Sequence, residues 1–231
     1  MNTISERAVI HEKVKLGSEC TIEDFAVIGA PLRGDDTFPE TIIGDKAVIR
    51  SHTVIYAGNV IGDRFQTGNK ANIREHNEIG DDVSVGTLSM VEHHVRIEDG
   101  VRIHSQVFVP EHTHLKRGCW LGPNVVLTNA RYPKTRLTKE QLEGPIIEEE
   151  AKVGANSTIL PGVRVGSYCL IGAGSLVVRD TMDQGLYLGN PARRIGWMCT
   201  CGVPLKPYGN EQHCSGCGKR YRERSGVLRE I

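Results

Sequence analysis

The feature that most constrains this chain is a period of six residues in its apolar side chains. From Ile43 to Leu127, each sixth residue is isoleucine, leucine or valine, with Thr67 as the exception. Shorter runs, from Ile10 to Ile28 and from Ile147 to Val177, keep this period in a shifted phase. A period of six differs from the 3.6 residues of a helical turn and from the two-residue alternation of a strand. It predicts a unit of short strand and tight turn, repeated along the chain.

The fifth position of each hexad, usually small or β-branched, predicts the interior of the fold. Cys20, Cys119 and Cys169 occupy this position, so packing explains them better than catalysis does. Asn59 and Asn77 share it eighteen residues apart, and we expect them to stack as a buried amide pair.

The charge balance limits the partners of the protein. Among 231 residues, 28 Lys and Arg stand against 28 Asp and Glu, which leaves no basic surplus to grip a phosphate backbone. The sequence has no apolar run long enough for a signal peptide or a membrane span. We therefore expect a soluble, cytoplasmic protein that binds neither nucleic acid nor membrane.

The hexads resemble those of the hexapeptide-repeat proteins, in which three hexads form one triangular coil of a left-handed parallel β-helix. The resemblance extends from about Ile10 to Val178 and implies an all-β fold of about eight coils, since the runs hold 25 hexads. Two interruptions, residues 30–41 and 129–146, are expected to form inserted loops. We expect a β-helix domain over residues 1–196 and a small module over residues 197–231.

One corner of this β-helix is expected to carry the active site. One coil holds eighteen residues, so His76, His94 and His112 should form a column of imidazoles. Both interruptions leave from the same corner, and long loops on a rigid scaffold often build sites. An imidazole near neutrality is the usual general base for an amine or hydroxyl that attacks a thioester. Glu75 and Glu111 flank the column and would favour the charged form of the nearest ring.

Three segments resemble parts of the CoA-dependent N-acyltransferases that acetylate nucleotide-linked amino sugars in bacterial glycan synthesis: Ile103–Glu111, Gly122–Asn129 and Gly189–Arg193. The resemblance implies a homotrimer with active sites in the clefts between subunits and acetyl-CoA along the later coils. It implies backbone contacts to pantetheine from Gly172, Ala173 and Gly174. The other cofactor-binding candidates are Arg179, Asn190, Arg193 and Arg194, whose arginines would lie near the CoA phosphates.

For catalysis we expect His112 to act as the base and Glu111 to orient it. Further catalytic candidates are His94, His76, Glu75 and His104, the last of which replaces the glycine expected in its hexad. Candidates for substrate positioning are Ser105, Gln106, Asn129 and Tyr132. Some relatives use an amine that is already neutral, which leaves open whether a base is needed.

Two other interpretations stay open. The zinc hydratase branch of the same fold, which resembles carbonic anhydrase, takes three histidines from two subunits. His76 and His112 have one of the separations that its pattern requires, but Arg117 stands where the paired histidine is needed, which disfavours a catalytic metal. The second interpretation is a non-catalytic β-helix that acts as an assembly scaffold.

Four cysteines beyond the repeat predict a metal site: Cys199, Cys201, Cys214 and Cys217. Two cysteine pairs, each followed by glycine and separated by twelve residues, are typical of a zinc knuckle or ribbon with four cysteine ligands. So short a module cannot bury enough apolar surface alone, so zinc would supply its folding free energy. We expect a structural role, either capping the end of the stack or steadying the CoA cleft.

Overall fold

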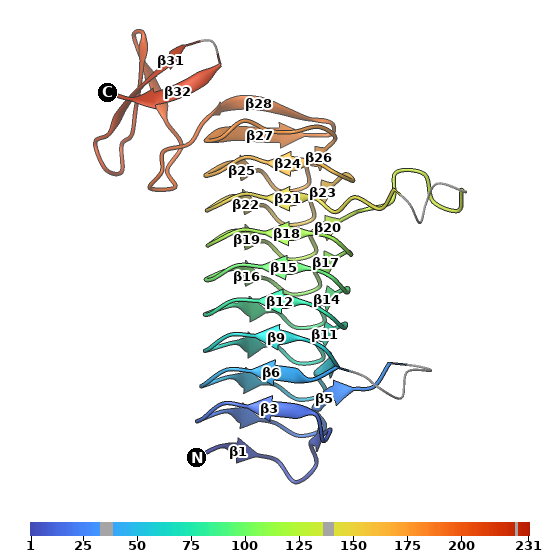
Figure 1. The fold of residues 1–231 in the computed structure, drawn as a ribbon. Helices are drawn as coiled ribbons and strands as arrows, with labels where there is room; N and C mark the ends of the chain where they lie inside the picture. The colour runs from blue at the N-terminus through green and yellow to red at the C-terminus, as the bar shows by residue number, and fades with distance from the viewer. Residues whose placement is uncertain (33–38, 136–140, 225) are drawn as a thin grey trace.

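The structure is a computed structural model that describes residues 1–32, 39–135, 141–224 and 226–231. The described residues form strands and no helix, in agreement with the expected all-β class. Most strands are two or three residues long and stack into three parallel sheets, which make the faces of a β-solenoid (Figure 1). The described chain has no helix long and apolar enough to span a membrane.

Each sheet collects every third strand of the repeat. Sheet A contains β1 (Thr3–Ile4), β4 (Thr21–Ile22), β7 (Val48–Ile49), β10 (Gln66–Thr67), β13 (Ser84–Val85), β16 (Arg102–Ile103), β19 (Trp120–Leu121), β22 (Lys152–Val153), β25 (Leu170–Ile171), β27 (Gly185–Gly189) and β28 (Ala192–Trp197). Sheet B contains β2 (Val9–Ile10), β5 (Val27–Ala30), β8 (Val54–Tyr56), β11 (Asn72–Ile73), β14 (Met90–Val91), β17 (Phe108–Val109), β20 (Val126–Leu127), β23 (Thr158–Ile159) and β26 (Leu176–Val177). Sheet C contains β3 (Val14–Leu16), β6 (Thr41–Ile43), β9 (Val60–Ile61), β12 (Glu78–Ile79), β15 (Arg96–Ile97), β18 (His114–Leu115), β21 (Ile146–Ile147) and β24 (Arg164–Val165).

The register confirms the period of eighteen. Ile73 pairs with Ile55 on one side and with Val91 on the other, and all three side chains are fully buried. The first position of each hexad therefore points into the solenoid, where its apolar side chain packs on the coils above and below. Asn59 and Asn77 are buried as expected, and the Asn77 amide N–H donates to Asn59 Oδ1 at 3.0 Å.

The number of turns differs from the expectation. Sheet A has ten parallel strands, from β1 to β27, before the antiparallel strand β28, so the solenoid has about ten turns instead of eight. The expectation counted only the hexads between Ile10 and Val177. Strand β1 precedes that stretch, and β27 follows it with a shorter spacing that breaks the period.

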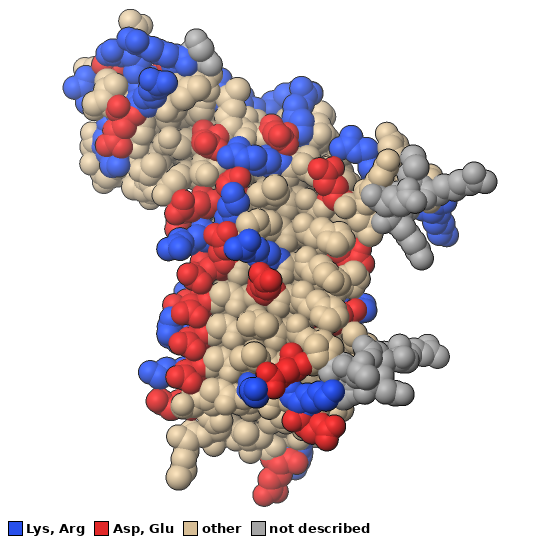
Figure 2. All heavy atoms as spheres, in the orientation of Figure 1, with Lys and Arg blue, Asp and Glu red and all other residues tan. Residues whose placement is uncertain are grey.

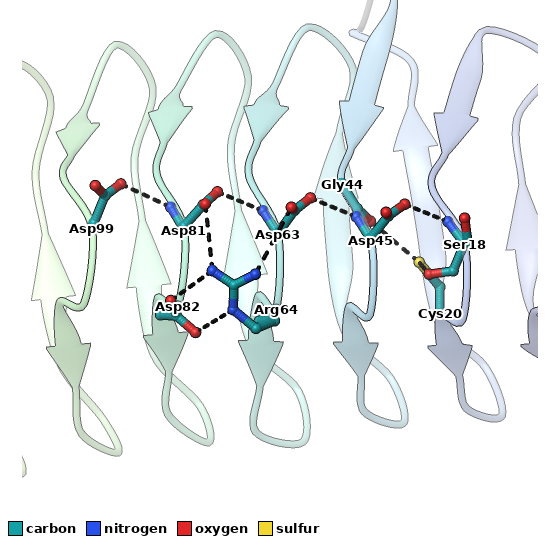
Figure 3. A network of polar contacts seen from close by, with 9 residues as sticks. All are labelled: Ser18, Cys20, Gly44, Asp45, Asp63, Arg64, Asp81, Asp82 and Asp99. Atoms are coloured by element: carbon teal, nitrogen blue, oxygen red, sulfur yellow. Dashed lines mark hydrogen bonds and ion pairs between the residues drawn. The ribbon is translucent and has the colours of Figure 1, made fainter.

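The corner between sheets C and A carries a ladder of aspartates (Figure 3). In each coil the Asp amide N–H donates to Oδ1 of the Asp one coil later: Asp45 to Asp63 at 2.8 Å, Asp63 to Asp81 at 2.8 Å and Asp81 to Asp99 at 3.0 Å. Gly62 explains why the hexad carries glycine here, because a Cβ at this position would lie 2.3 Å from Asp81 Oδ1. At this corner glycine therefore permits a close approach of side chain and backbone.

The last 35 residues build a second core on an antiparallel sheet. Sheet D contains β29 (Lys206–Tyr208), β30 (Glu211–His213), β31 (Arg220–Arg224) and β32 (Val227–Glu230). Its apolar cluster consists of Trp197, Cys199, Leu205, Cys214, Tyr221 and Leu228. Trp197 closes β28 and also belongs to this cluster, so the end of the solenoid leads directly into the module, drawn at the upper left of Figure 1.

Candidate functional site

The three histidines of the expected column lie together at the corner between sheets B and C. The ring centroids of His76 and His94 are 5.3 Å apart, and those of His94 and His112 are 6.0 Å apart. All three residues are exposed and have φ between 56° and 62°, because each takes the left-handed turn position of its hexad. The column was predicted from the spacing, and its geometry is confirmed.

A fourth histidine, His93, links this column to a carboxylate. His93 Nε2 lies 2.7 Å from Glu111 Oε1, and His93 Nδ1 lies 2.8 Å from His94 Nδ1. Asn129 Nδ2 donates to the other oxygen of Glu111 at 3.3 Å. Among the described residues, Glu111 contacts His93 and Asn129 through its carboxylate and not His112, the partner expected from the sequence. The His-His pair at one corner was the signal that could have identified His93.

One pair of tautomers connects Glu111, His93 and His94 in a single chain of hydrogen bonds. In this arrangement Glu111 accepts a hydrogen bond from Nε2–H of His93, and Nδ1 of that ring carries a lone pair. His94 then donates its Nδ1–H to His93, which leaves the lone pair of His94 on Nε2. No other described residue hydrogen-bonds His94 Nε2, and an oriented imidazole with an available ring nitrogen has the arrangement that a general base requires.

The surroundings of His94 keep this ring neutral. Although His94 is exposed overall, its partial desolvation among the stacked rings lowers its pKa, and the neighbouring imidazoles of His93, His76 and His112 lower it further. Glu75 opposes them with the smallest effect on the His94 pKa. A neutral imidazole at neutral pH is the form that accepts a proton.

Glu75 is engaged elsewhere. Its carboxylate accepts two hydrogen bonds from the Arg74 guanidinium, at 2.8 and 2.9 Å, and Arg74 also pairs with Glu92 at 3.4 Å. Burial, the largest single effect, raises the pKa of the Glu75 carboxyl, but the hydrogen bonds and charge of Arg74, a backbone hydrogen bond and the charge of His93 together outweigh it, so the net pKa is lowered. Glu75 therefore remains ionised and helps to fix the corner below His93 and His94.

Both interruptions of the repeat leave the solenoid beside the column, on the same side in Figure 1. The first runs between β5 and β6 and the second between β20 and β21. A Cβ at Gly58 would lie 2.7 Å from Pro39 and 2.8 Å from His76 Nδ1, so the first loop approaches the column closely. In the second loop, Asn129 reaches Glu111, whereas Tyr132 is 62% exposed. Residues 33–38 and 136–140 of the two expected loops lie outside the described residues.

The other sequence candidates lie on a different face of the same chain. Ser105 and His104 line a hollow of about 350 Å³ on sheet A, where the His104 ring packs edge-on against Trp120 at 5.5 Å. Gln106 follows at the corner between sheets A and B. Within one chain, these three residues are therefore separated from the histidine column. A hollow of about 630 Å³ on sheet C is lined by charged side chains that include Arg96 and Glu98.

Three arginines expected near the cofactor come together at the end of the stack. Arg179, Arg193 and Arg194 line a hollow of about 210 Å³ between the segment after β26 and the β27–β28 hairpin. Gly172, Ala173 and Gly174 lie just before β26, and Asn190 is exposed in the turn of the hairpin. A Cβ at Gly172 would overlap the Leu188 side chain, so this glycine permits the hairpin to pack on the last coils.

The four cysteines converge in the C-terminal module. Their sulfur atoms all lie within 4.8 Å of one another, with Cys199 3.5 Å from Cys217 and Cys201 3.4 Å from Cys214. The amide N–H of Gly216 donates to Cys214 Sγ at 3.4 Å, the type of contact that stabilises a thiolate ligand. Four thiols at this separation fit a tetrahedral metal site.

Comparison with known proteins identifies relatives of this chain. The chain is 43% identical over 86 residues to dTDP-3-amino-3,6-dideoxy-alpha-D-galactopyranose 3-N-acetyltransferase of Aneurinibacillus thermoaerophilus, covering 37% of this chain and 44% of that protein. It is 40% identical over 74 residues to galactoside O-acetyltransferase of Lactococcus lactis subsp. lactis, a stretch that covers 30% of this chain and 36% of that protein. The chain thus spans less than half the length of these relatives.

The fold also matches a solved structure. The crystal structure of Francisella novicida UDP-N-acetylglucosamine acyltransferase superposes with a TM-score of 0.71 at 18% identity, covering 84% of this chain and 70% of that one. At this identity the match concerns the fold. Within the solenoid, residues 144–179 match the model of the bacterial transferase hexapeptide family (six repeats).

Proposed function

We propose that this protein is a CoA-dependent acyltransferase that N-acetylates an amino group of a nucleotide-linked sugar in bacterial glycan synthesis. The observation that carries the proposal is the Glu111–His93–His94 arrangement, in which His94 Nε2 has no hydrogen-bond partner within the described part of the chain. The resemblance to a dTDP-amino-sugar N-acetyltransferase supports the amine as acceptor.

The chemistry requires one proton transfer. The sugar amine attacks the thioester carbonyl of acetyl-CoA, a C–N bond forms, and the C–S bond breaks. His94 Nε2 takes the proton that the amine loses, and the departing CoA thiolate receives a proton to leave as the thiol. Glu111 is a positioning residue, because it acts on the substrate only through His93. His112 and His76 flank the base, and they would contact the substrate or lower the pKa of His94.

We place the cofactor on the later coils. The backbone of Gly172, Ala173 and Gly174 would contact the pantetheine arm. A Cβ at Gly174 would meet no described atom within 4 Å, which leaves open space at this end of the segment, and Asn190 would lie beside the arm. The guanidinium groups of Arg179, Arg193 and Arg194 would bind the CoA phosphates, since arginine pairs with phosphate through two parallel hydrogen bonds.

We further propose a homotrimer assembled through sheet B. In each of its strands, the outward residue that precedes the inward aliphatic residue is uncharged: Val9, Val27, Val54, Asn72, Met90, Phe108, Val126, Thr158 and Leu176. Sheets A and C carry charged side chains such as Arg102 and Arg96 instead. Sheet B borders both the column and Gln106, so a neighbouring copy would bring Ser105 and Gln106 toward the column.

The four-cysteine cluster is proposed to hold a structural zinc ion. Cys199, Cys201, Cys214 and Cys217 supply the full tetrahedral set, which leaves no open position for catalysis. Bound zinc would cross-link the two ends of the module and supply the folding free energy that its small core lacks.

A second candidate function is a metal-dependent hydratase. The observation that favours it is the group formed by Glu92, His93 and Glu111, whose ligand atoms lie within 4.8 Å of one another. These side chains already have partners within the chain, since Glu92 pairs with Arg74 and Glu111 pairs with His93. We therefore favour the acyltransferase. Metal content of a variant that lacks the four cysteines separates the two candidates, because only the hydratase retains a bound metal.

The direct test offers acetyl-CoA with UDP-, dTDP- and GDP-linked amino sugars, and follows thiol release and product mass. The matched control for each acceptor is the same nucleotide sugar with a hydroxyl in place of the amine. We expect an N-acetylated product with at least one amino sugar and none with its hydroxyl counterpart. Transfer to hydroxyl acceptors alone would exclude the N-acetyltransferase, and carbon dioxide hydration without acetyl transfer would favour the second candidate.

A further inference from the structure

One arginine of the hollow at the end of the stack contacts the C-terminal module. Arg179, Arg193 and Arg194 line this hollow together with Asp180. The Asp180 carboxylate accepts a hydrogen bond from the Arg164 amide N–H at 2.9 Å. The lining is thus net basic, as an anion site requires.

Arg194 is the arginine that the module holds. Its guanidinium carbon lies 4.0 Å from the centroid of the Trp197 ring, and its Nη2 lies 3.3 Å from Glu223 Oε1. The second oxygen of Glu223 accepts a hydrogen bond from Trp197 Nε1 at 2.7 Å. Glu223 therefore fixes both the guanidinium and the indole on which the guanidinium stacks.

This clamp is continuous with the cysteine cluster. Glu223 and Tyr221 lie two residues apart on β31, so both side chains face the same side of the strand. Tyr221 is buried, and its hydroxyl lies 3.2 Å from Cys199 Sγ and 3.4 Å from Thr200 Oγ1. Trp197 packs in the same apolar cluster as Cys199. The strand that presents Glu223 is thereby fastened to the first cysteine.

We propose that metal binding at the four cysteines positions Arg194 in the anion-binding hollow through Glu223 and Trp197, so that metal loading controls the affinity for the CoA phosphates. This inference rests on the proposed function. Without the metal the small module loses its folding free energy, and Glu223 and Trp197 are released from Arg194. A mobile guanidinium must then be ordered when the phosphate binds, which weakens binding. Glu223 is a positioning residue, because it acts on the anion through Arg194.

The test measures CoA binding by calorimetry on the full-length protein, loaded with zinc or stripped of it by a chelator. The key variant is Glu223→Gln. The glutamine oxygen still accepts from Trp197, but its amide NH2 faces the guanidinium and cannot accept from it. The matched control is Glu230→Gln, which removes the same charge from the same module, where Glu230 pairs with Lys219 at 2.9 Å. Metal content of each variant confirms that the zinc remains bound.

We expect Glu223→Gln to weaken CoA binding about tenfold in the zinc-loaded protein, because a preorganised guanidinium is lost. Simple electrostatics predicts the opposite, since removal of a negative charge beside an anion site strengthens binding. Zinc removal should weaken binding of the wild type by a similar factor and should abolish the difference between the wild type and Glu223→Gln, since both changes release the same clamp.

Unchanged or tighter CoA binding in Glu223→Gln, or unchanged binding after zinc removal, would overturn the inference while leaving the proposed function intact. A zinc-loaded wild type that binds no CoA would instead refute the proposed function, and the inference with it.

Discussion

The proposed chemistry depends on the imidazole of His94. Its ring is oriented by His93, whose other nitrogen is oriented by Glu111. Sequence spacing predicted that His76, His94 and His112 would stack, because the repeat determines where each Cα lies. It did not predict that Glu111 would turn toward His93, because that depends on the side-chain torsions of two neighbouring rings at an exposed turn.

The pH dependence of acetyl transfer should report the lowered pKa of His94. The base must be neutral, so activity falls as the pH drops through this pKa, and the acid limb should lie below the ordinary histidine value of about 6.5. His76→Asn removes one neighbouring imidazole that lowers the pKa of His94, so it should move this limb to higher pH. The measurement is kcat/KM against pH, and a limb that does not move would show that His94 is not the titrating base.

Phe65 should be the costliest core residue to truncate. It fills a position that is small in most hexads and is fully buried two residues before Thr67, the one polar residue in the long run of inward aliphatic positions. Its ring thus offsets the missing volume of an isoleucine. Phe65→Ala should lower the free energy of unfolding by about 3–5 kcal/mol in urea titrations. A loss below about 1 kcal/mol would mean that the neighbouring coils close the cavity.

At the scale of the strands and corners, the aspartate ladder joins consecutive coils. Asp63 Oδ1 accepts from the Asp45 amide, and Asp63 also pairs with Arg64 in the same network (Figure 3). Asp63→Ala should cost about 1 kcal/mol more than Asp63→Asn, because the asparagine oxygen can still accept from the backbone. Denaturation at low and high salt checks the cause: the difference should persist in high salt, and its disappearance there would point to charge pairing instead.

The same corner shows what a repeat pattern can predict about an element. At Gly62 the reason for glycine lies in the next coil, because the Asp81 carboxylate occupies the space that a Cβ would need. The strands, their inward residues and the vertical register all followed from the period. The last of the two added turns did not, because β27 and β28 form a hairpin that breaks that period, whereas the first added turn, at β1, keeps the period and only precedes the counted stretch.

For the whole molecule, sheet B is the face on which the proposed trimer depends. Phe108 and Val126 are 38% and 39% exposed at the centre of its uncharged strip. Phe108→Lys should dissociate the trimer, because a lysine buried at an apolar interface lacks a partner for its charge. Light scattering after gel filtration measures the mass. Val60→Lys, at an equally outward position on sheet C, should remain trimeric.

A monomeric wild type, or a trimer that survives Phe108→Lys, would contradict an assembly through sheet B.

The C-terminal module belongs to this scale as well. Its cysteines were predicted from their spacing, whereas the contact of Arg194 with Glu223 joins residues 29 positions apart on separate sheets and followed from no local pattern. Figure 2 shows Lys and Arg side chains gathered on this module, of which Arg220 and Arg222 pair with Glu211.

The central claim, that His94 is the base of an acetyl transfer, is tested most directly by kcat for His94→Asn against His52→Asn. Both histidines take the same left-handed turn position, with φ of 56° and 60°, and asparagine tolerates that conformation. At saturating acetyl-CoA and amino sugar, His94→Asn should lower kcat by about 100-fold or more, and His52→Asn by less than about twofold. Equal kcat values for the two variants would contradict the account.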